Sequence, residues 1–329
     1  MEKMNLADRM KVYEKVPRIY LERKKPVIIR IDGKAFHTFT RGFRKPFDNC
    51  IVRAMQATMM RLCKEIQGCV LGYTQSDEIT LVLTDYNTEK SDAWFQYNVQ
   101  KMTSIAASIA TLEFNKVIQK ELITASTNGE ITSETCYKLS KKEAMFDARA
   151  WSLPVDEVNN CLVWRQRDAI RNSIQGLAQA NFSHKELHKS NTTQMIEKLQ
   201  SEKGVDWNDL PIYLQRGTTC IREYVVHKTG LQLLKTEWKL DENIPLFNNN
   251  TNYVENLVFV GLLSSKYDIN DKVRVKGNDS GIGLIVYTKL ERGQFYYSID
   301  TYNGEFECLW WPENSIIKVD VTQETNNER

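Results

Sequence analysis

The sequence predicts an α+β protein with a large N-terminal part and a small all-β part at the C-terminus. Between about residues 26 and 153, apolar runs with strand periodicity alternate with longer runs of helical periodicity. After about residue 266, short strands follow one another between Gly, Asn and Asp turns. The chain has 329 residues, of which 42% are hydrophobic, so it is long enough for one large core or two smaller ones.

Six elements are expected in the N-terminal part. They are a strand at 26–32, a helix from the N-cap Asp48 to Gly68, strands at 69–74 and 79–84 joined by the turn QSDE, a helix opened by Ser91, and a strand at 144–153. This β-α-β-β-α-β order is typical of the ferredoxin-like fold. In that fold the first strand lies beside the central hairpin, so Asp32 at its end and the hairpin turn meet at one edge of the sheet.

Helical faces are predicted from apolar spacing. Residues 5–16 place Leu6, Met10 and Tyr13 on one face, and Pro17 ends that helix. In the helix after Ser91, the predicted buried face is Val99, Met102, Ile105, Ile109 and Leu112. Residues 161–200 are expected to be mainly helical, and the stretch from Pro211 to Tyr224 irregular or in short strands.

Three regions follow from these patterns. Residues 1–262 are expected to form the larger part, a ferredoxin-like core with added helices, and residues 263–320 a small SH3-like or Tudor-like barrel. Residues 321–329 are expected to be a disordered tail. No run reaches the roughly 18 apolar residues that span a membrane. The seven cysteines are scattered and odd in number, which indicates free thiols in a reducing cytoplasm.

Charge is uneven along the chain although the formal net charge is only +2. Residues 1–50 hold 13 Lys and Arg against 6 Asp and Glu. A basic segment in a nearly neutral protein favours a polyanionic partner, although a solvated basic surface gives the same composition.

Asp32, Asp77 and Glu78 are the strongest chemical signal. Each is an ordinary turn residue when taken alone. On neighbouring strands of the predicted sheet, however, such acids hold two divalent ions about 3.5–4 Å apart. Mg²⁺ prefers one or two carboxylates together with phosphate oxygens. The sequence therefore predicts two Mg²⁺ ions per site and phosphoryl transfer.

The segment GKAFHTF (33–39) follows Asp32 directly. Gly33 allows close backbone approach, Lys34 adds charge, and successive backbone N–H groups at such a corner bind phosphate as a nest. His37 is a candidate for stacking on a base, and Lys45 and Lys101 are candidate phosphate ligands. HKELH (184–188) has metal-binding spacing but lacks a third ligand, so a solvated or RNA-facing helix is favoured.

Five stretches together resemble the tRNA-histidine guanylyltransferase family and its tRNA-repair relatives, which add nucleotides in the 3′-to-5′ direction. They are RIDGKAFHTFTRGFRKPFD, GYTQSDEITLVL, FDARAWSLP, WRQRDAIRNS and RGT, and the resemblance covers about residues 5–262. It implies a fold like the palm of ordinary polymerases, a tRNA substrate and a homotetramer.

Site residues follow from the resemblance position by position. Asp32 and Asp77 match the metal-binding acids, Gly33 the backbone-carbonyl metal contact and Glu78 the second hairpin acid. The triphosphate loop and further polar positions around the nucleotide match Lys34, Ala35, Phe36, His37, Lys45, Ser76 and Lys101. The residues expected to contact RNA are Arg165, Arg171, Asn172, His184 and Lys185.

The implied chemistry has three steps. ATP activates a tRNA 5′-monophosphate by adenylylation, and the 3′-OH of an incoming GTP or other nucleotide displaces AMP. Pyrophosphate is then removed from the new 5′ end. Positioning and electrostatics dominate each of these steps.

One position departs from the histidine-tRNA pattern. After WRQ-x-D, that branch carries Cys-His-Ile-Asn-Asn, whereas this chain has Ala169, Ile170, Arg171, Asn172 and Ser173. Ile170 therefore occupies the histidine position, which indicates the template-dependent branch that repairs truncated 5′ ends.

Two other functions remain open from the sequence. A nucleotide cyclase has a similar palm but needs a GG[DE]EF-type hairpin, and TQSDEI lacks it. A non-catalytic RNA-binding protein would not need acids at both metal positions. In the C-terminal part, Phe295, Tyr296, Tyr297, Trp310 and Trp311 could stack on bases or form a core. Residues 267–318 hold 6 Lys and Arg against 8 Asp and Glu, which favours a packing, oligomer or partner-protein role over RNA binding.

Overall fold

The computed structural model describes residues 4–86, 91–226, 233–258, 267, 270–276, 282–291, 294–300 and 310–319. The chain forms two compact units, one made of Met1–Cys220 and Leu240–Thr251 and the other of Ile221–Lys239 and Asn252–Arg329. This division differs from the expected boundary at 262/263, because residues 221–239 belong to the second unit. The tail 321–329 lies outside the described residues.

The first unit is a mixed α/β structure, as expected. Its elements in chain order are α1 (Leu6–Lys15), β1 (Val27–Gly33), α2 (Phe36–Phe39), α3 (Asn49–Glu65), β2 (Cys69–Gln75), β3 (Glu78–Leu83), α4 (Val99–Thr127), α5 (Ser133–Ser140), β4 (Phe146–Ser152), α6 (Glu157–Asn181), α7 (Thr192–Lys198), α8 (Ile212–Arg216) and the start of β5 (Thr218–Val226).

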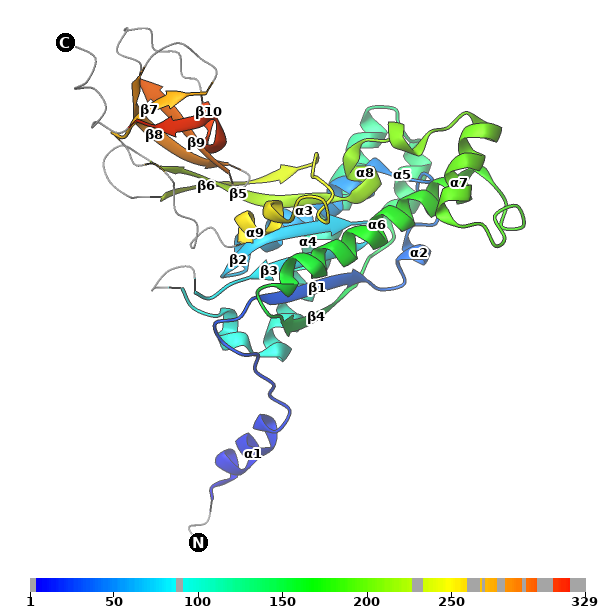
Figure 1. The fold of residues 1–329 in the computed structure, drawn as a ribbon. Coiled ribbons are helices and arrows are strands. Elements are labelled where there is room, and N and C mark those ends of the chain that lie inside the picture. The colour runs from blue at the N-terminus through cyan, green and yellow to red at the C-terminus, as the bar shows by residue number, and fades with distance from the viewer. Residues whose placement is uncertain are drawn as a thin grey trace, which may run out of the picture. The chain divides into compact units, whose positions relative to one another are not determined.

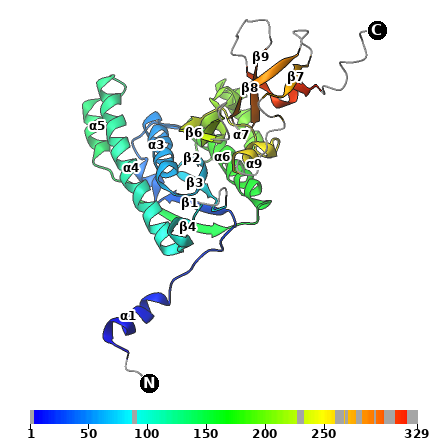
Figure 2. The ribbon, with the colours of Figure 1, turned by 90° about the vertical axis from the view of Figure 1, so that its left-hand side faces the viewer.

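Its sheet has the antiparallel strand order β5-β2-β3-β1-β4, so β1 lies between the hairpin strand β3 and β4. Helices α3 and α4 lie side by side on one face of the sheet, and α6 lies across the other face (Figures 1 and 2). The register pairs Asp32 of β1 with Glu78 of β3 and with Asp147 of β4. Because partners in register point to the same face, these three acids line one row on the α6 side.

Helix α4 buries a face that agrees only in part with the predicted one, since Met102 is buried as expected. Its buried residues are Met102, Ala106, Ala110, Phe114, Ile118, Leu122 and Ala125. Of the residues expected inside, Ile105 is 40% and Leu112 is 73% exposed. Ala106 and Ala110 let α4 approach its neighbours closely, and the buried residues follow one another at every third or fourth position along this helix of 29 residues. Small residues were not counted in the predicted face, which explains the error.

Three local predictions also need correction. The helix expected from Ser91 begins only at Val99, because the side chain of Asn98 caps it by accepting from the N–H of Lys101 at 3.1 Å. HKELH is a turn and not a helix, with Leu187 packed into the core and His184 exposed. The stretch after Pro211, expected to be irregular or in short strands, begins with the short helix α8 and only then forms a strand, β5.

Helix α1 forms where expected but buries none of its residues. Its apolar residues Leu6, Met10 and Tyr13 are 65%, 48% and 67% exposed. Across the described residues, none of the helices combines the length and the hydropathy needed to cross a bilayer.

The second unit is mainly strands, with one helix. It contains most of β5, β6 (Leu233–Asp241), α9 (Thr251–Val258), β7 (Lys272–Val275), β8 (Gly283–Glu291), β9 (Gln294–Asp300), β10 (Trp310–Pro312) and β11 (Ile316–Lys318). The described strands pair in the order β10-β9-β8-β7-β11, and β8 also pairs with β5. These described strands do not close on themselves, so the SH3-like barrel remains a prediction.

Aromatic side chains of the second unit contribute to its core. Tyr297 is fully buried beside Tyr267, and Phe295 and Trp311 pack against the same cluster. These three of the five candidate stacking residues therefore have a packing role.

The buried face of α4 can be tested by replacing single side chains with alanine. Phe114 is fully buried, with ring centroids 5.3–5.6 Å from those of Phe36, Phe39 and Phe146. Phe114→Ala should lower the free energy of unfolding by about 3–5 kcal/mol, through lost burial and the cavity left behind. Leu112→Ala, two residues earlier and exposed, should cost less than about 1 kcal/mol. Urea denaturation of both variants measures the two free energies of unfolding. Equal losses would contradict the assignment of Phe114 to the buried face of α4 and of Leu112 to the exposed face.

Candidate active site

The end of β1 and the β2–β3 turn are joined directly. The backbone N–H of Gly33 donates to the carbonyl oxygen of Asp77 at 3.1 Å. A Cβ added at Gly33 would lie 2.5 Å from the Phe36 ring and 3.1 Å from the Cβ of Asp77. Only glycine therefore lets the two segments approach this closely. Asp32 and Asp77 are brought together at one edge of the sheet, where the sequence placed them.

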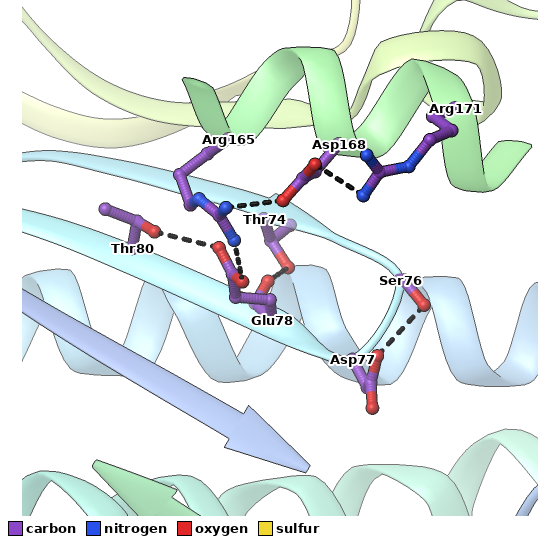
Figure 3. A network of polar contacts seen from close by, with 8 residues as sticks. All are labelled: Thr74, Ser76, Asp77, Glu78, Thr80, Arg165, Asp168 and Arg171. Atoms are coloured by element: carbon purple, nitrogen blue, oxygen red, sulfur yellow. Dashed lines mark hydrogen bonds and ion pairs between the residues drawn. The ribbon is translucent and has the colours of Figure 1, made fainter. Parts of the chain in front are cut away.

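The two hairpin acids point in different directions. Glu78 turns toward α6, whereas Asp77 points away from that side at the tip of the turn (Figure 3). Burial raises the pKa of the Asp77 carboxyl, and the Ser76 hydroxyl, which donates to it at 3.0 Å, opposes this shift. The nearby charge of Asp32 raises that pKa further. The two carboxylates are thus close enough to repel each other.

Glu78 is held in a buried ion-pair network. Arg165 of α6 donates to Glu78 at 2.8 Å and also to Asp168, one helical turn later. The side chains of Arg165 and Glu78 are only 7% and 9% exposed. Burial raises the pKa of Glu78, and the charge of Arg165 acts against that rise. Arg171 bonds the other oxygen of Asp168 at 2.7 Å and extends the network to the surface (Figure 3).

A cavity of about 530 Å³ opens beside Asp77. Its walls come from the loop after β1, the N-terminal half of α3, the hairpin, and parts of α6 and α8. The predicted residues that line it are Gly33, Ala35, Phe36, His37, Lys45, Ser76, Asp77 and Asn172. Its size falls within the roughly 300–1,000 Å³ typical of small-molecule sites.

Backbone donors face this cavity at the loop after β1. Ala35 adopts a left-handed conformation with φ +50°. Within the part of the chain that the structure describes, the N–H groups of Ala35, Phe36 and His37 have no protein acceptor. Successive free N–H groups in a left-handed corner form an anion-binding concavity. Lys45 adds an exposed positive charge on the same wall.

Other predicted residues lie elsewhere. Lys101 is in the first turn of α4, with its ammonium 5.8 Å from the Phe95 ring. The residue of α4 that packs against Phe36 of the cavity wall is Phe114, thirteen residues and roughly 20 Å further along the helix. The structure therefore does not bring Lys101 to the cavity. Lys34 is exposed and its side chain does not line the cavity, and His184 and Lys185 are exposed in the turn after α6.

Arg165 does not lie where an RNA contact was expected, since it is buried beneath Glu78 and Asp168. Asp168 itself was missed, although it stands in the quoted WRQRD stretch. Its spacing of three residues from both Arg165 and Arg171 was a usable signal for an ion-paired helix surface. Tyr213, Gln215 and Gly217 also line the cavity and were not predicted.

The donor set at the edge fits Mg²⁺. Asp32 and Asp77 supply two carboxylates that repel each other without a cation, and Gly33 supplies a carbonyl oxygen at the same corner. Among the described residues, no group of three or more His, Cys, Asp or Glu side chains converges as a closed protein cage. Two carboxylates with room for phosphate oxygens are the arrangement that Mg²⁺ prefers.

Comparisons with known proteins agree with this architecture. A family model described as tRNAHis guanylyltransferase matches residues 7–154. A bacterial tRNA(His) guanylyltransferase-like protein, solved in complex with ATP, is 40% identical with a TM-score of 0.67, and the match covers 78% of this chain and all of that one. A second such structure, in complex with GTP, is 38% identical with a TM-score of 0.62, covering 77% of this chain and 99% of that one.

Sequence relatives come from several lineages. An uncharacterized protein of Acanthamoeba polyphaga mimivirus is 31% identical over 246 residues, which are 70% of this chain and 79% of that protein. A probable tRNA(His) guanylyltransferase of Drosophila melanogaster is 28% identical over 220 residues, 61% of this chain and 68% of its own.

The matched fold and motifs define a mixed α/β member of an enzyme family whose named relatives are transferases. The chain belongs to the tRNA-histidine guanylyltransferase family. The resemblance drawn from the five sequence stretches is thereby confirmed.

The buried ion pair gives a stability prediction. Arg165→Met should lower the free energy of unfolding by about 3–5 kcal/mol, because it leaves the Glu78 carboxylate buried without its partner. Arg171→Met removes the other arginine bonded to Asp168, which is 56% exposed, and should cost less than about 1 kcal/mol. Urea denaturation at pH 7 measures both variants. A small loss for Arg165→Met would mean that the pair does not hold the hairpin to α6.

Proposed function

We propose that this protein is a template-dependent 3′-to-5′ nucleotidyltransferase that adds nucleotides to the 5′ end of tRNA, in 5′-end repair or tRNA-His guanylylation. The catalytic unit is proposed to be a polymerase-like palm on the ferredoxin-like strand order. The observation that carries the proposal is the meeting of Asp32 and Asp77 at one sheet edge, at the mouth of a cavity with free backbone donors.

The comparisons support a nucleotide substrate. The bacterial relatives were solved with ATP and with GTP. In this chain we assign the cavity of about 530 Å³ to the activating or incoming nucleotide. The N–H groups of Ala35, Phe36 and His37 would bind its triphosphate, and Lys45 and Ser76, which also line the cavity, would add polar contacts around it. Lys34 stays a predicted phosphate contact from the sequence, because it does not line the cavity.

Asp32, Asp77 and the carbonyl of Gly33 would hold Mg²⁺. When bound, two such ions lower the barrier by activating the attacking oxygen and neutralising charge on the reacting phosphate. Glu78 is assigned a positioning role, because its carboxylate is engaged by Arg165. Through that pair it fixes β3, and therefore the Asp77 turn, against α6.

The proposed reaction proceeds by three displacements at phosphorus. An oxygen of the tRNA 5′-monophosphate attacks the α-phosphorus of ATP, and pyrophosphate leaves. The 3′-OH of the incoming nucleotide then attacks the activated 5′-phosphate, and AMP leaves. Water finally releases pyrophosphate from the added nucleotide. The residues of the chain act by holding the reacting groups in line.

Template dependence rests on Ile170. Its side chain packs against the apolar cluster formed by α6, α7 and the following turns. An apolar side chain in that cluster has no donor or acceptor for an unpaired base. Base selection is therefore left to Watson–Crick pairing with the opposite nucleotide.

Further assignments stay proposals. Arg171 and Asn172 on α6, with His184 and Lys185 in the turn after it, are exposed and available to RNA. Arg165 is proposed to contribute to RNA binding only indirectly, by bonding Asp168, which also bonds Arg171. We keep the homotetramer as a proposal, with the exposed apolar residues of α1 as a candidate contact between copies. Lys101 is not assigned to the cavity, and its role as a phosphate ligand stays a prediction from the sequence alone.

The carboxylates are tested by isosteric substitution. Asp32→Asn or Asp77→Asn should reduce Mg²⁺-dependent addition of labelled nucleotide to a 5′-truncated tRNA by about 10³, as expected for loss of a dominant electrostatic group. The control is Asp156→Asn, an exposed carboxylate at the start of α6 whose side chain makes no capping bond. Near-normal turnover in either site variant would overturn the metal assignment. Binding of tRNA without any addition by the unmodified protein would instead support a non-catalytic RNA-binding protein.

Specificity gives a second test. Addition of G opposite C73 should exceed addition of G opposite A73 by more than roughly tenfold, which corresponds to about 1.4 kcal/mol in the barrier. Single-turnover rates on two tRNA-His transcripts that differ only at position 73 measure this. Equal rates on the two transcripts would refute template dependence.

A further inference from the structure

An arginine between two indoles lies on the sheet outside the cavity. The guanidinium carbon of Arg30, on β1, is 5.9 Å from the ring centroid of Trp151 on β4 and 5.8 Å from that of Trp164 on α6. Trp164 is 51% exposed, and the guanidinium of the buried Arg165 lies 3.6 Å from its ring centroid. We call Arg30, Trp151 and Trp164 the Trp–Arg platform.

The Arg30 guanidinium has no close carboxylate partner. Across the described residues, no carboxylate lies within ion-pair distance of it and its side chain makes no hydrogen bond, although its charge opposes the rise in the pKa of Glu78. Its register partner on β4 is Arg149, which is 59% exposed and 3.8 Å from its nearest carboxylate, Asp147. Two arginines therefore stand side by side with at most one weak ion pair between them.

The platform lies next to the proposed reaction centre. Arg30 is two residues before Asp32 on the same strand, so both side chains point to the same face, roughly 7 Å apart along the strand. None of Arg30, Arg149, Trp151 and Trp164 lines the cavity assigned to the free nucleotide. A group resting on the platform would thus be near the carboxylates without competing for that cavity.

Packing alone explains this arrangement less well. A side chain that only covers the sheet would bury its indole, whereas half of Trp164 lies in solvent beside a guanidinium that has no carboxylate within ion-pair distance. The matching chemistry has a flat π-face for the indole and a negative charge for the arginines. A nucleotide of an RNA strand offers both.

We propose that the Trp–Arg platform binds a nucleotide of the RNA substrate beside its reacting end, with a base stacked on the face of Trp164 opposite Arg165 and a phosphate held by Arg30 and Arg149. The occupant is a single-stranded or end nucleotide, because a base inside a duplex has no free face for an indole. This assignment rests on the proposed function for the nature of the RNA.

The test measures binding and addition separately in the full-length protein. Affinity is measured with a 3′-fluorescein-labelled 5′-truncated tRNA by anisotropy over a range of salt concentrations, and ATP affinity by calorimetry. The variants are Trp164→Ala, Trp164→Phe and Arg149→Gln. The control is Tyr137→Ala on α5, since Tyr137 is also exposed, at 64%, and also has a cation, Lys141, 4.7 Å from its ring centroid.

Trp164→Ala should weaken tRNA binding by roughly tenfold or more without changing its salt dependence, because stacking releases no counterions. Trp164→Phe should recover most of the affinity, which excludes general loss of structure as the cause. Arg149→Gln should reduce the slope of log affinity against log salt by about one. Tyr137→Ala should bind tRNA like the unmodified protein, and ATP affinity should be unchanged throughout.

Two results would overturn the proposal. One is tRNA affinity in Trp164→Ala no weaker than in Tyr137→Ala, and the other is loss of ATP affinity in Trp164→Ala, which would assign the indole to a free nucleotide. Failure of the proposed function would look different. The unmodified protein would then add no nucleotide to any tRNA, while its RNA affinity still depended on Trp164.

Discussion

The close approach of the β1 end to the β2–β3 turn is the constraint on which the rest of the site depends. The bond from the Gly33 N–H to the Asp77 carbonyl closes the corner, and the absence of a side chain on Gly33 makes room for it. Two carboxylates then stand near each other, and the charge of Asp32 contributes to raising the pKa of Asp77. A cation relieves that repulsion, so the same geometry favours metal binding.

The Arg165 network shows how the sheet tolerates such a concentration of acids. Glu78 stands in the same row as Asp32 and Asp147, and a third free carboxylate there would add to the repulsion. Arg165 of α6 neutralises the charge of Glu78 by pairing with its carboxylate. A buried pair of this kind adds little net stability over apolar packing, although losing one partner is costly. The pair fixes the direction of the Glu78 side chain. Asp77 is therefore the hairpin acid that lines the cavity.

The sequence predicted the strand order and the meeting of Asp32 with Asp77, since both follow from periodicity and from one topological rule. It did not predict the buried face of α4, because Ala106 and Ala110 contribute close approach and not hydrophobic contrast. Arg165 looked like a surface cation, since nothing local to it shows that Glu78, eighty-seven residues earlier, is its partner. Lys101 failed to reach the cavity for the opposite reason: its place is set by the length of α4. Pairings across distant elements are thus the part of the site that local patterns cannot supply.

The two faces of the sheet in the first unit differ in character: one is covered by apolar packing, and the other carries charged side chains. On one face, α3 and α4 bury apolar side chains such as Met59 and Phe114 completely. On the other, α6 brings charged side chains to the sheet, and Arg149 of the edge strand β4 keeps a largely exposed guanidinium beside Arg30. An anionic strand on this face would be attracted by the arginines, and its reacting end would then lie near the acids. The proposed RNA site and the cavity that Asp77 lines are therefore separate, and only the cavity has the volume of a small-molecule site.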